Sequence, residues 1–308
     1  MKAAIINNYA TPVTVTDIAK PALLDDSVMI EVHASSVNPV DNLIRAGYLS
    51  AVLPIQFPYT IGNDVSGVIT EIGKNVTRFS VGDEVFARPD GMQSGTFAEF
   101  VMVKEQDLAK KPANLSHEEA ASLPLVALTA WQALVSKANL QAGQKVLIHA
   151  GSGGVGSIAI QIAKHLGATV ATTTSAENMA MVKALGADTA IDYQTQSFAE
   201  IVKDYDVVFD TLGGTTRTQS FSVLKKGGYL ISVIAPPDAS GQAEQLGVKS
   251  EVFFMWPSGE QLAQIGALVE QGVIKAIVDR TYSLDEAQQA LDYSQSGRAK
   301  GKIVIKLK

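Results

Sequence analysis

Six consecutive residues near the middle of the chain, Gly151-Ser-Gly-Gly-Val-Gly156, have the spacing G-x-G-x-x-G. They follow an apolar run, 145–149, and open a helix-like segment, which is the context in which this spacing binds a pyrophosphate. The first glycine permits a tight turn, the second lets the backbone approach phosphate, and the third permits close packing of helix on strand. The helix N-terminus adds free N–H groups and partial positive charge. The motif predicts a dinucleotide site made of Gly151, Ser152, Gly153, Gly154, Val155 and Gly156.

The next apolar run indicates which dinucleotide binds. NAD sites place an acidic residue about 20 residues after the motif, where it holds the ribose hydroxyls. Here the run ends in Thr173, Thr174 and Ser175, whose hydroxyls can bind a 2′-phosphate without repelling it. The nearest acid, Glu177, falls in the first turn of the next helix, where it complements the helix dipole. The sequence therefore favours NADPH.

These residues need a parallel sheet to position them. Strand-like runs at 145–149, 169–173, 189–192, 206–210 and 228–234 alternate with helix-like runs at 156–166, 176–185, 195–203 and 216–225. This alternation is typical of right-handed βαβ units. Ser250–Phe254 is predicted to be the sixth, edge strand, through which we expect a homodimer.

The two ends of the chain have a different pattern. Short β-favouring runs at 28–34, 65–72 and 83–87, separated by Gly and Pro, predict a compact β-rich domain before residue 120. After residue 255, helices are expected near 259–271 and 284–296. A closing strand, Lys302–Lys306, is predicted to return to the first domain.

Composition excludes several classes of protein. The 308 residues suffice for two domains, and the net charge of −6 argues against nucleic acid as a partner. The absence of cysteine excludes disulfides, thiolate nucleophiles and cysteine-ligated zinc. No run of ~18 apolar residues predicts a membrane span, so we expect a cytoplasmic protein without a membrane partner. The four histidines are expected on strand or helix surfaces rather than at a metal: His33, His117, His149 and His165.

Six further segments strengthen the prediction: Ser36-Val-Asn-Pro-Val-Asp41, Ile61-Gly-Asn-Asp-Val-Ser-Gly67, Gly95-Thr-Phe-Ala-Glu99, Leu128-Thr-Ala-Trp131, Ile191-Asp-Tyr193 and Gly297-Arg-Ala-Lys-Gly-Lys302. With them the chain resembles, over essentially its whole length, the zinc-free medium-chain dehydrogenase/reductases of the quinone oxidoreductase (ζ-crystallin-like) and alkenal reductase group. The resemblance implies an α/β protein with a GroES-like β-rich catalytic domain, residues 1–122 and 266–308. A doubly wound Rossmann domain, residues 123–265, would lie between these two segments in sequence, and the ligand cleft would lie between the two domains.

The resemblance also implies residue roles. Thr129 would lie near the nicotinamide ribose, Tyr193 beside the adenosine phosphate, and Arg298 near the 2′-phosphate. Val233, Ile234 and Ala235 would pass the nicotinamide. A helix-cap threonine, a buried tyrosine and a surface arginine are the alternative interpretations. Asn178 replaces a lysine that reaches the 2′-phosphate in bacterial quinone reductases, and Leu43 replaces a tyrosine of their pocket.

Zinc-containing relatives carry a cysteine near the first of these segments and a histidine in the second. Here the corresponding stretches are 35–38 and 62–64, which contain Asn38 and Asn63, so no metal is expected. The implied reaction is hydride transfer from NADPH to a quinone or an α,β-unsaturated carbonyl compound. The oxygen that gains charge needs a hydrogen-bond donor, for which Asn38, Arg45 and Tyr48 are the candidates, with a backbone N–H as an alternative.

Two other functions remain open on the sequence. One is an NADPH-binding sensor or structural protein without turnover. The other is a zinc-free alcohol or aldehyde reductase, which is disfavoured because no metal would polarise a simple carbonyl group.

Overall fold

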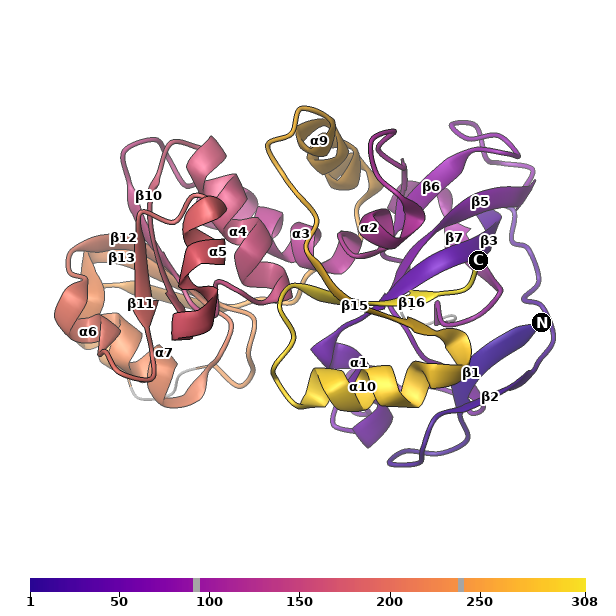
Figure 1. Ribbon diagram of the computed structural model, residues 1–308, viewed down its shortest axis with the longest axis horizontal. Coiled ribbons are helices and arrows are strands. Elements are labelled where there is room, and N and C mark those ends of the chain that lie inside the picture. The colour runs from indigo at the N-terminus through magenta and orange to yellow at the C-terminus, as the bar shows by residue number, and fades with distance from the viewer. Residues whose placement is uncertain (91–94, 238–240) are drawn as a thin grey trace. The chain divides into compact units, whose positions relative to one another are not determined.

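The computed structural model describes residues 1–90, 95–237 and 241–308 (Figure 1). The chain divides into two compact units, one formed by Met1–Leu128 with Trp256–Lys308 and the other by Thr129–Met255. Helix α3 (Pro124–Trp131) crosses the first division. The predicted boundary at 265/266 falls inside α9 (Gly259–Glu270), which packs on the first unit. A Cβ atom on Gly259 would lie only 2.2 Å from the carbonyl oxygen of Leu108.

The second unit contains a six-stranded parallel sheet in the order β11-β10-β9-β12-β13-β14. Helices α4 and α5 lie on one face of this sheet and α6 and α7 on the other (Figure 1). Because both faces are covered, the central strands are runs of buried apolar residues. The elements are β9 (Lys145–Ile148), α4 (Gly154–His165), β10 (Thr169–Thr174), α5 (Met179–Ala184), β11 (Thr189–Asp192), α6 (Phe198–Ile201), β12 (Tyr205–Asp210), α7 (Gly214–Ser220), β13 (Leu224–Ser232), α8 (Gln242–Leu246) and β14 (Lys249–Val252).

The first unit contains a three-stranded sheet, β2-β1-β4, and a seven-stranded sheet, β15-β16-β3-β5-β6-β8 with β7 beside β3. Helix α10 packs against α1 (Figure 1). The elements are β1 (Lys2–Ile6), β2 (Thr14–Asp17), β3 (Ser27–Val37), α1 (Pro39–Ala46), β4 (Tyr59–Thr60), β5 (Asp64–Ile72), β6 (Glu84–Ala87), β7 (Phe100–Lys104), β8 (Leu108–Lys110), α2 (His117–Ala121), β15 (Val278–Ser283), α10 (Ala287–Gln295) and β16 (Lys302–Lys306).

The closing strand agrees with prediction, and one helix end does not. Strand β16 pairs antiparallel with β3, with Ile303 opposite Val37, so the closing strand does return to the first domain. The helix predicted over 216–225 is too long: α7 stops at Ser220, and β13 begins at Leu224, which pairs with Tyr205. Sheet pairing here overrides the local helical pattern. Strand β14 is the edge of the described sheet, and the homodimer through it stays a prediction that sedimentation velocity tests.

Candidate functional site

The glycine loop lies at the carboxyl end of β9, where the strand order of the second unit reverses. Ala150 begins the turn with a φ of 53°, and α4 starts at Gly154. A Cβ atom on Gly151 would lie 2.1 Å from Thr172 Oγ1, and one on Gly156 would lie 2.3 Å from the Ala150 carbonyl oxygen. The packing of the protein itself therefore requires both of these glycines.

Gly153 is different, because protein packing does not require it. A Cβ atom there would meet only the Ala150 carbonyl oxygen, at 3.3 Å, a tight contact that a shift of a few tenths of an ångström would relieve. Gly153 is the N-cap of α4 and is only half-buried. Space is thus kept free in front of a helix N-terminus, at the switch point of a parallel sheet. Backbone N–H groups at such a position bind phosphate.

Uncharged polar side chains gather beside this loop. Thr174 Oγ1 donates a hydrogen bond of 3.0 Å to Ser152 Oγ. Asn178 Nδ2 lies 3.3 Å from the same Ser152 oxygen and 3.1 Å from Ser175 Oγ. The structure therefore brings four predicted site residues together. The acid at the end of β11, Asp192, accepts hydrogen bonds from the residues that follow it rather than facing this group.

Thr173 and His149 have buried, structural contacts. Thr173 Oγ1 accepts a hydrogen bond from the Ala150 N–H at 3.2 Å and lies 3.1 Å from His149 Nδ1. His149 Nε2 lies 2.8 Å from Ser220 Oγ. Burial lowers the pKa of His149 to about 4, although the nearby Asp210 opposes the shift, so the ring is neutral at pH 7. The surface position predicted for His149 is wrong because its strand is covered on both faces.

A cavity of 400 Å³ opens at the carboxyl ends of these strands. Its wall carries Tyr193, 57% exposed, and Leu212, 51% exposed, and the Tyr193 N–H donates to the Thr174 carbonyl oxygen at 3.1 Å. The rest of the lining is buried or uncharged and polar: His149, Thr173, Gln194, Thr195, Gln196, Ser197, Phe198, Thr216 and Gln219. An aromatic ring, an aliphatic side chain and neutral polar groups suit a flat, uncharged heterocycle.

The remaining predicted residues lie at several places. Thr129 is buried in α3, and Val233 and Ile234 are half-buried just after β13, followed by the exposed Ala235. Arg298 is exposed after α10 and belongs to the first unit. The cofactor roles of these residues stay predictions.

In the first unit, a buried polar cluster joins the starts of α1, β5 and β16. Asp64 Oδ2 accepts hydrogen bonds from Ser36 Oγ at 2.8 Å and Asn38 Nδ2 at 2.7 Å. Lys302 Nζ lies 3.4 Å from the same oxygen and also donates to Asn38 Oδ1 and, at 2.8 Å, to the Val37 carbonyl oxygen. Burial lowers the pKa of Lys302, while the nearby carboxylates, led by Asp64, oppose that shift. Sequence reasoning missed this lysine.

A second part of the cluster holds α1 itself. Asp41 Oδ2 accepts from the Asn38 N–H at 2.6 Å, and its Oδ1 accepts from Asn63 Nδ2 at 2.6 Å. Asn38 has no exposed surface, and both ends of its amide are engaged, so in this conformation it positions the helix. Its role as a donor to substrate stays a prediction. Tyr48, by contrast, is 79% exposed. Arg45 is half-buried, so its exposure is intermediate between those of Asn38 and Tyr48.

The residues at the positions that resemble zinc ligands do not fit a zinc ion. Asn38 and Asn63 present amides that bind protein carboxylates, and the Lys302 ammonium group beside them repels a second cation. Over residues 1–90, 95–237 and 241–308, no three His, Cys, Asp or Glu side chains group as metal ligands.

Asp41 is expected to make stability depend on pH. Burial raises its pKa to about 6, and the hydrogen bonds from Asn38 and Asn63 only partly oppose this. Because the folded pKa exceeds the unfolded value of about 3.9, the folded state binds the extra proton, and stability falls as pH rises from about 4 to about 6. Asp41→Asn has no carboxyl group to titrate and should not show this loss. Relative to wild type, the variant should therefore gain ~3 kcal/mol of unfolding free energy as the pH rises from 4 to 7.

Urea unfolding across that pH range measures the difference. Asp17→Asn, at an exposed position on β2, is the control and should follow wild type. Parallel curves for wild type and Asp41→Asn would contradict the assignment.

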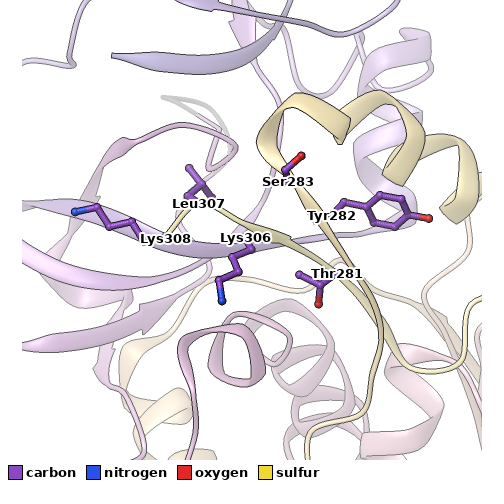
Figure 2. Close-up of a pocket in the computed structure, with 6 residues that line it drawn as sticks. All are labelled: Thr281, Tyr282, Ser283, Lys306, Leu307 and Lys308. Carbon is purple, nitrogen blue, oxygen red and sulfur yellow. The ribbon is translucent and has the colours of Figure 1, made fainter.

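The hollow at the ends of β15 and β16, of 360 Å³, is a poorer candidate. Figure 2 shows that Tyr282, Lys306 and Lys308 point in different directions from it. Lys306 pairs with Glu118 and Lys308 with Glu31. Its side chains therefore do not converge on one ligand. Among the described residues, no helix is long and apolar enough to cross a bilayer, and the cytoplasmic location stays a prediction.

Comparison with known proteins supplies the family. Residues 24–113 match the family described as "Alcohol dehydrogenase GroES-like domain", and 185–305 match "Zinc-binding dehydrogenase". The chain is 36% identical to the mouse (Mus musculus) "NAD(P)H oxidoreductase RTN4IP1, mitochondrial", over 91% of this chain and 81% of that protein. It is 36% identical to "2-methylene-furan-3-one reductase" of Solanum lycopersicum, over 94% and 74% of the two chains. The solved structure of the quinone oxidoreductase from Coxiella burnetii superposes with a TM-score of 0.91 at 34% identity, over 100% of this chain and 99% of that one.

Proposed function

The chain belongs to the medium-chain dehydrogenase/reductase superfamily, in the quinone oxidoreductase/alkenal reductase group, and from this membership we propose an NADPH-dependent oxidoreductase that reduces quinones or α,β-unsaturated carbonyl compounds. The observation that carries the proposal is the space kept free at Gly153, before α4, in a sheet whose order reverses there. Protein packing does not explain that glycine, whereas a bound pyrophosphate does.

The second unit would hold the cofactor by its backbone and by neutral side chains. The loop from Gly151 to Gly156 would bind the pyrophosphate. Ser152 would bind the 2′-phosphate together with Thr174 and Asn178, each of which lies within hydrogen-bond distance of the Ser152 hydroxyl. These residues carry no negative charge, which supports NADPH over NADH. The cavity beside Tyr193 and Leu212 suits the adenine ring.

NADPH, when bound, supplies the hydride, so the chain need only orient the substrate and stabilise the charge that develops on its oxygen. Arg45 and Tyr48 are the proposed donors to that oxygen, because both carry side-chain donors at the C-terminal end of α1 and neither is fully buried: Tyr48 is largely exposed and Arg45 is half-buried. Asn38 and Asp41 would not contact the substrate; they would hold α1, which carries Arg45, in position.

The names of the relatives support both substrate classes. The tomato relative is named for the reduction of a methylene-furanone, an enone, and the Coxiella structure is named a quinone oxidoreductase. A quinone and an enone share a carbonyl group conjugated to an electron-poor carbon. One donor to the carbonyl oxygen therefore serves both.

The test is the loss of NADPH absorbance with 1,4-benzoquinone and, separately, with 1-octen-3-one, repeated with NADH. We expect turnover with NADPH and at least one acceptor, and weaker use of NADH. Oxidation of NADH at equal efficiency would overturn the cofactor preference. If NADPH binds but neither acceptor is turned over, hexanal, a saturated aldehyde, is assayed next. Its reduction would favour the aldehyde reductase, and no reduction would favour the non-catalytic alternative.

A further inference from the structure

Arg217 is a buried cation on a short polar helix, α7, with only 5% of its surface exposed. Its Nε donates a 2.8 Å hydrogen bond to Oδ2 of Asp210, the last residue of β12. Burial acts to raise the pKa of Asp210, but hydrogen bonds from Arg217, from the Gly213 and Leu212 N–H groups and from Ser232 hold it below its usual value. Asp210 is therefore ionised and forms an ion pair with Arg217.

The same guanidinium group reaches the segment that leaves β13. Nη1 donates to the Pro236 carbonyl oxygen at 2.6 Å, and Nη2 donates to Ser232 Oγ at 2.8 Å and to the Ile234 carbonyl oxygen. One planar cation thus fixes this segment at three points. Gly213, in the loop after β12, packs closely against the same segment, since a Cβ atom on Gly213 would lie 2.8 Å from Ile234 Cγ2.

The sheet places this segment on one side of the glycine loop. Strand β13 is two strands from β9, about 10 Å at the usual strand spacing. On the other side of β9 lie β10 and β11. Strand β10 ends at Thr174, and β11 ends at the residue before Tyr193. A dinucleotide whose pyrophosphate lies at the loop extends to both sides. Because the neutral hydroxyl side suits the 2′-phosphate, the β13 side takes the nicotinamide half.

We propose that Arg217 is a positioning residue that holds the backbone of residues 233–235 in the conformation that receives the nicotinamide half of NADPH. This inference rests on the proposed function. Three bonds in fixed directions require a planar fork, which lysine lacks although it keeps the charge. Arg217→Lys should therefore preserve the pairing with Asp210 and lose the hold on the 233–235 backbone.

The experiment measures binding of two ligands by calorimetry. NADPH reports on both halves of the site, and adenosine 2′,5′-bisphosphate reports on the adenosine half alone. For Arg217→Lys we expect the Kd of NADPH to rise about tenfold, because the nicotinamide segment is no longer preorganised. The Kd of the bisphosphate should stay within about twofold. At saturating NADPH, kcat should fall by up to about 10²-fold, the effect of a misplaced reacting group.

Arg78→Lys is the matched control, since Arg78 is exposed and lies in the first unit. This variant should leave the Kd of both ligands unchanged. If the lysine variant does not fold, Arg217→Gln replaces it, since the glutamine amide reaches one carbonyl group at most. It too should weaken NADPH binding and leave binding of the bisphosphate unchanged. Equal weakening of both ligands would mean a general structural role and would overturn the inference, as would unchanged NADPH binding and kcat. Wild-type protein that binds neither ligand would instead overturn the proposed function.

Discussion

Replacing Gly153 by alanine is expected to weaken NADPH binding by at least ~100-fold, about 2.8 kcal/mol, with little change in the unfolding temperature. The new methyl group would have one close neighbour in the protein, the Ala150 carbonyl oxygen at 3.3 Å, and a shift of a few tenths of an ångström would accommodate it. It would, however, fill the space in front of α4 that the pyrophosphate needs. Calorimetric titration with NADPH and thermal unfolding of the free protein measure the two effects.

Gly156→Ala is the comparison variant in the same loop. Its Cβ atom would lie 2.3 Å from a backbone oxygen, so the loop or helix must move, which costs ~1–3 kcal/mol of stability. We expect Gly156→Ala to lose both stability and binding, and Gly153→Ala to lose binding alone. Gly153→Ala with wild-type affinity for NADPH would contradict the location of the phosphate site.

Lys302→Met is expected to lower the free energy of unfolding by ~3–5 kcal/mol. The substitution removes the cation that pairs with Asp64, which has no exposed surface, and so takes one of the partners of this buried carboxylate away. It also breaks the link between β16 and the segment before α1, made through the Val37 carbonyl oxygen and Asn38. Denaturant unfolding followed by fluorescence measures the loss, and weakened positioning of α1 should lower kcat as well.

Lys306→Met is the matched control on the same strand. Lys306 is half-exposed and pairs with Glu118 at 2.7 Å, an exposed type of ion pair worth ~0–1 kcal/mol. The double variant Lys302→Met/Asp64→Asn should recover part of the stability, because both buried charges are then gone. A Lys302→Met protein as stable as Lys306→Met would show that the buried pair contributes nothing.

Much of the second unit could be predicted from local sequence. The periodicity of strands and helices gave the elements from β9 to β12, and the spacing of Gly151, Gly153 and Gly156 gave the loop between β9 and α4. Helix and strand boundaries were less certain where pairing competes with local preference, as at Leu224. In the first unit, β15 escaped prediction because its residues are mostly polar and only partly buried.

The side-chain clusters depend on contacts between distant residues. Lys302 and Asp64 are 238 residues apart along the chain, and they come together only because β16 and β5 both pair with β3. Arg217 lies in a polar helix, and nothing in its neighbours indicates that it is buried against the carbonyl groups after β13. Asp210 did give a signal, because it is a polar residue at the carboxyl end of a buried strand.

The sequence by itself determined the parallel sheet, the glycine loop and the uncharged end of β10 from which we predict NADPH, because periodicity, glycine spacing and side-chain charge are local properties. Only the tertiary structure decided which glycine of the loop the protein's own packing does not require, which charges are buried together and which backbone segment Arg217 contacts. These depend on the distances between atoms from separate elements, which local patterns do not specify.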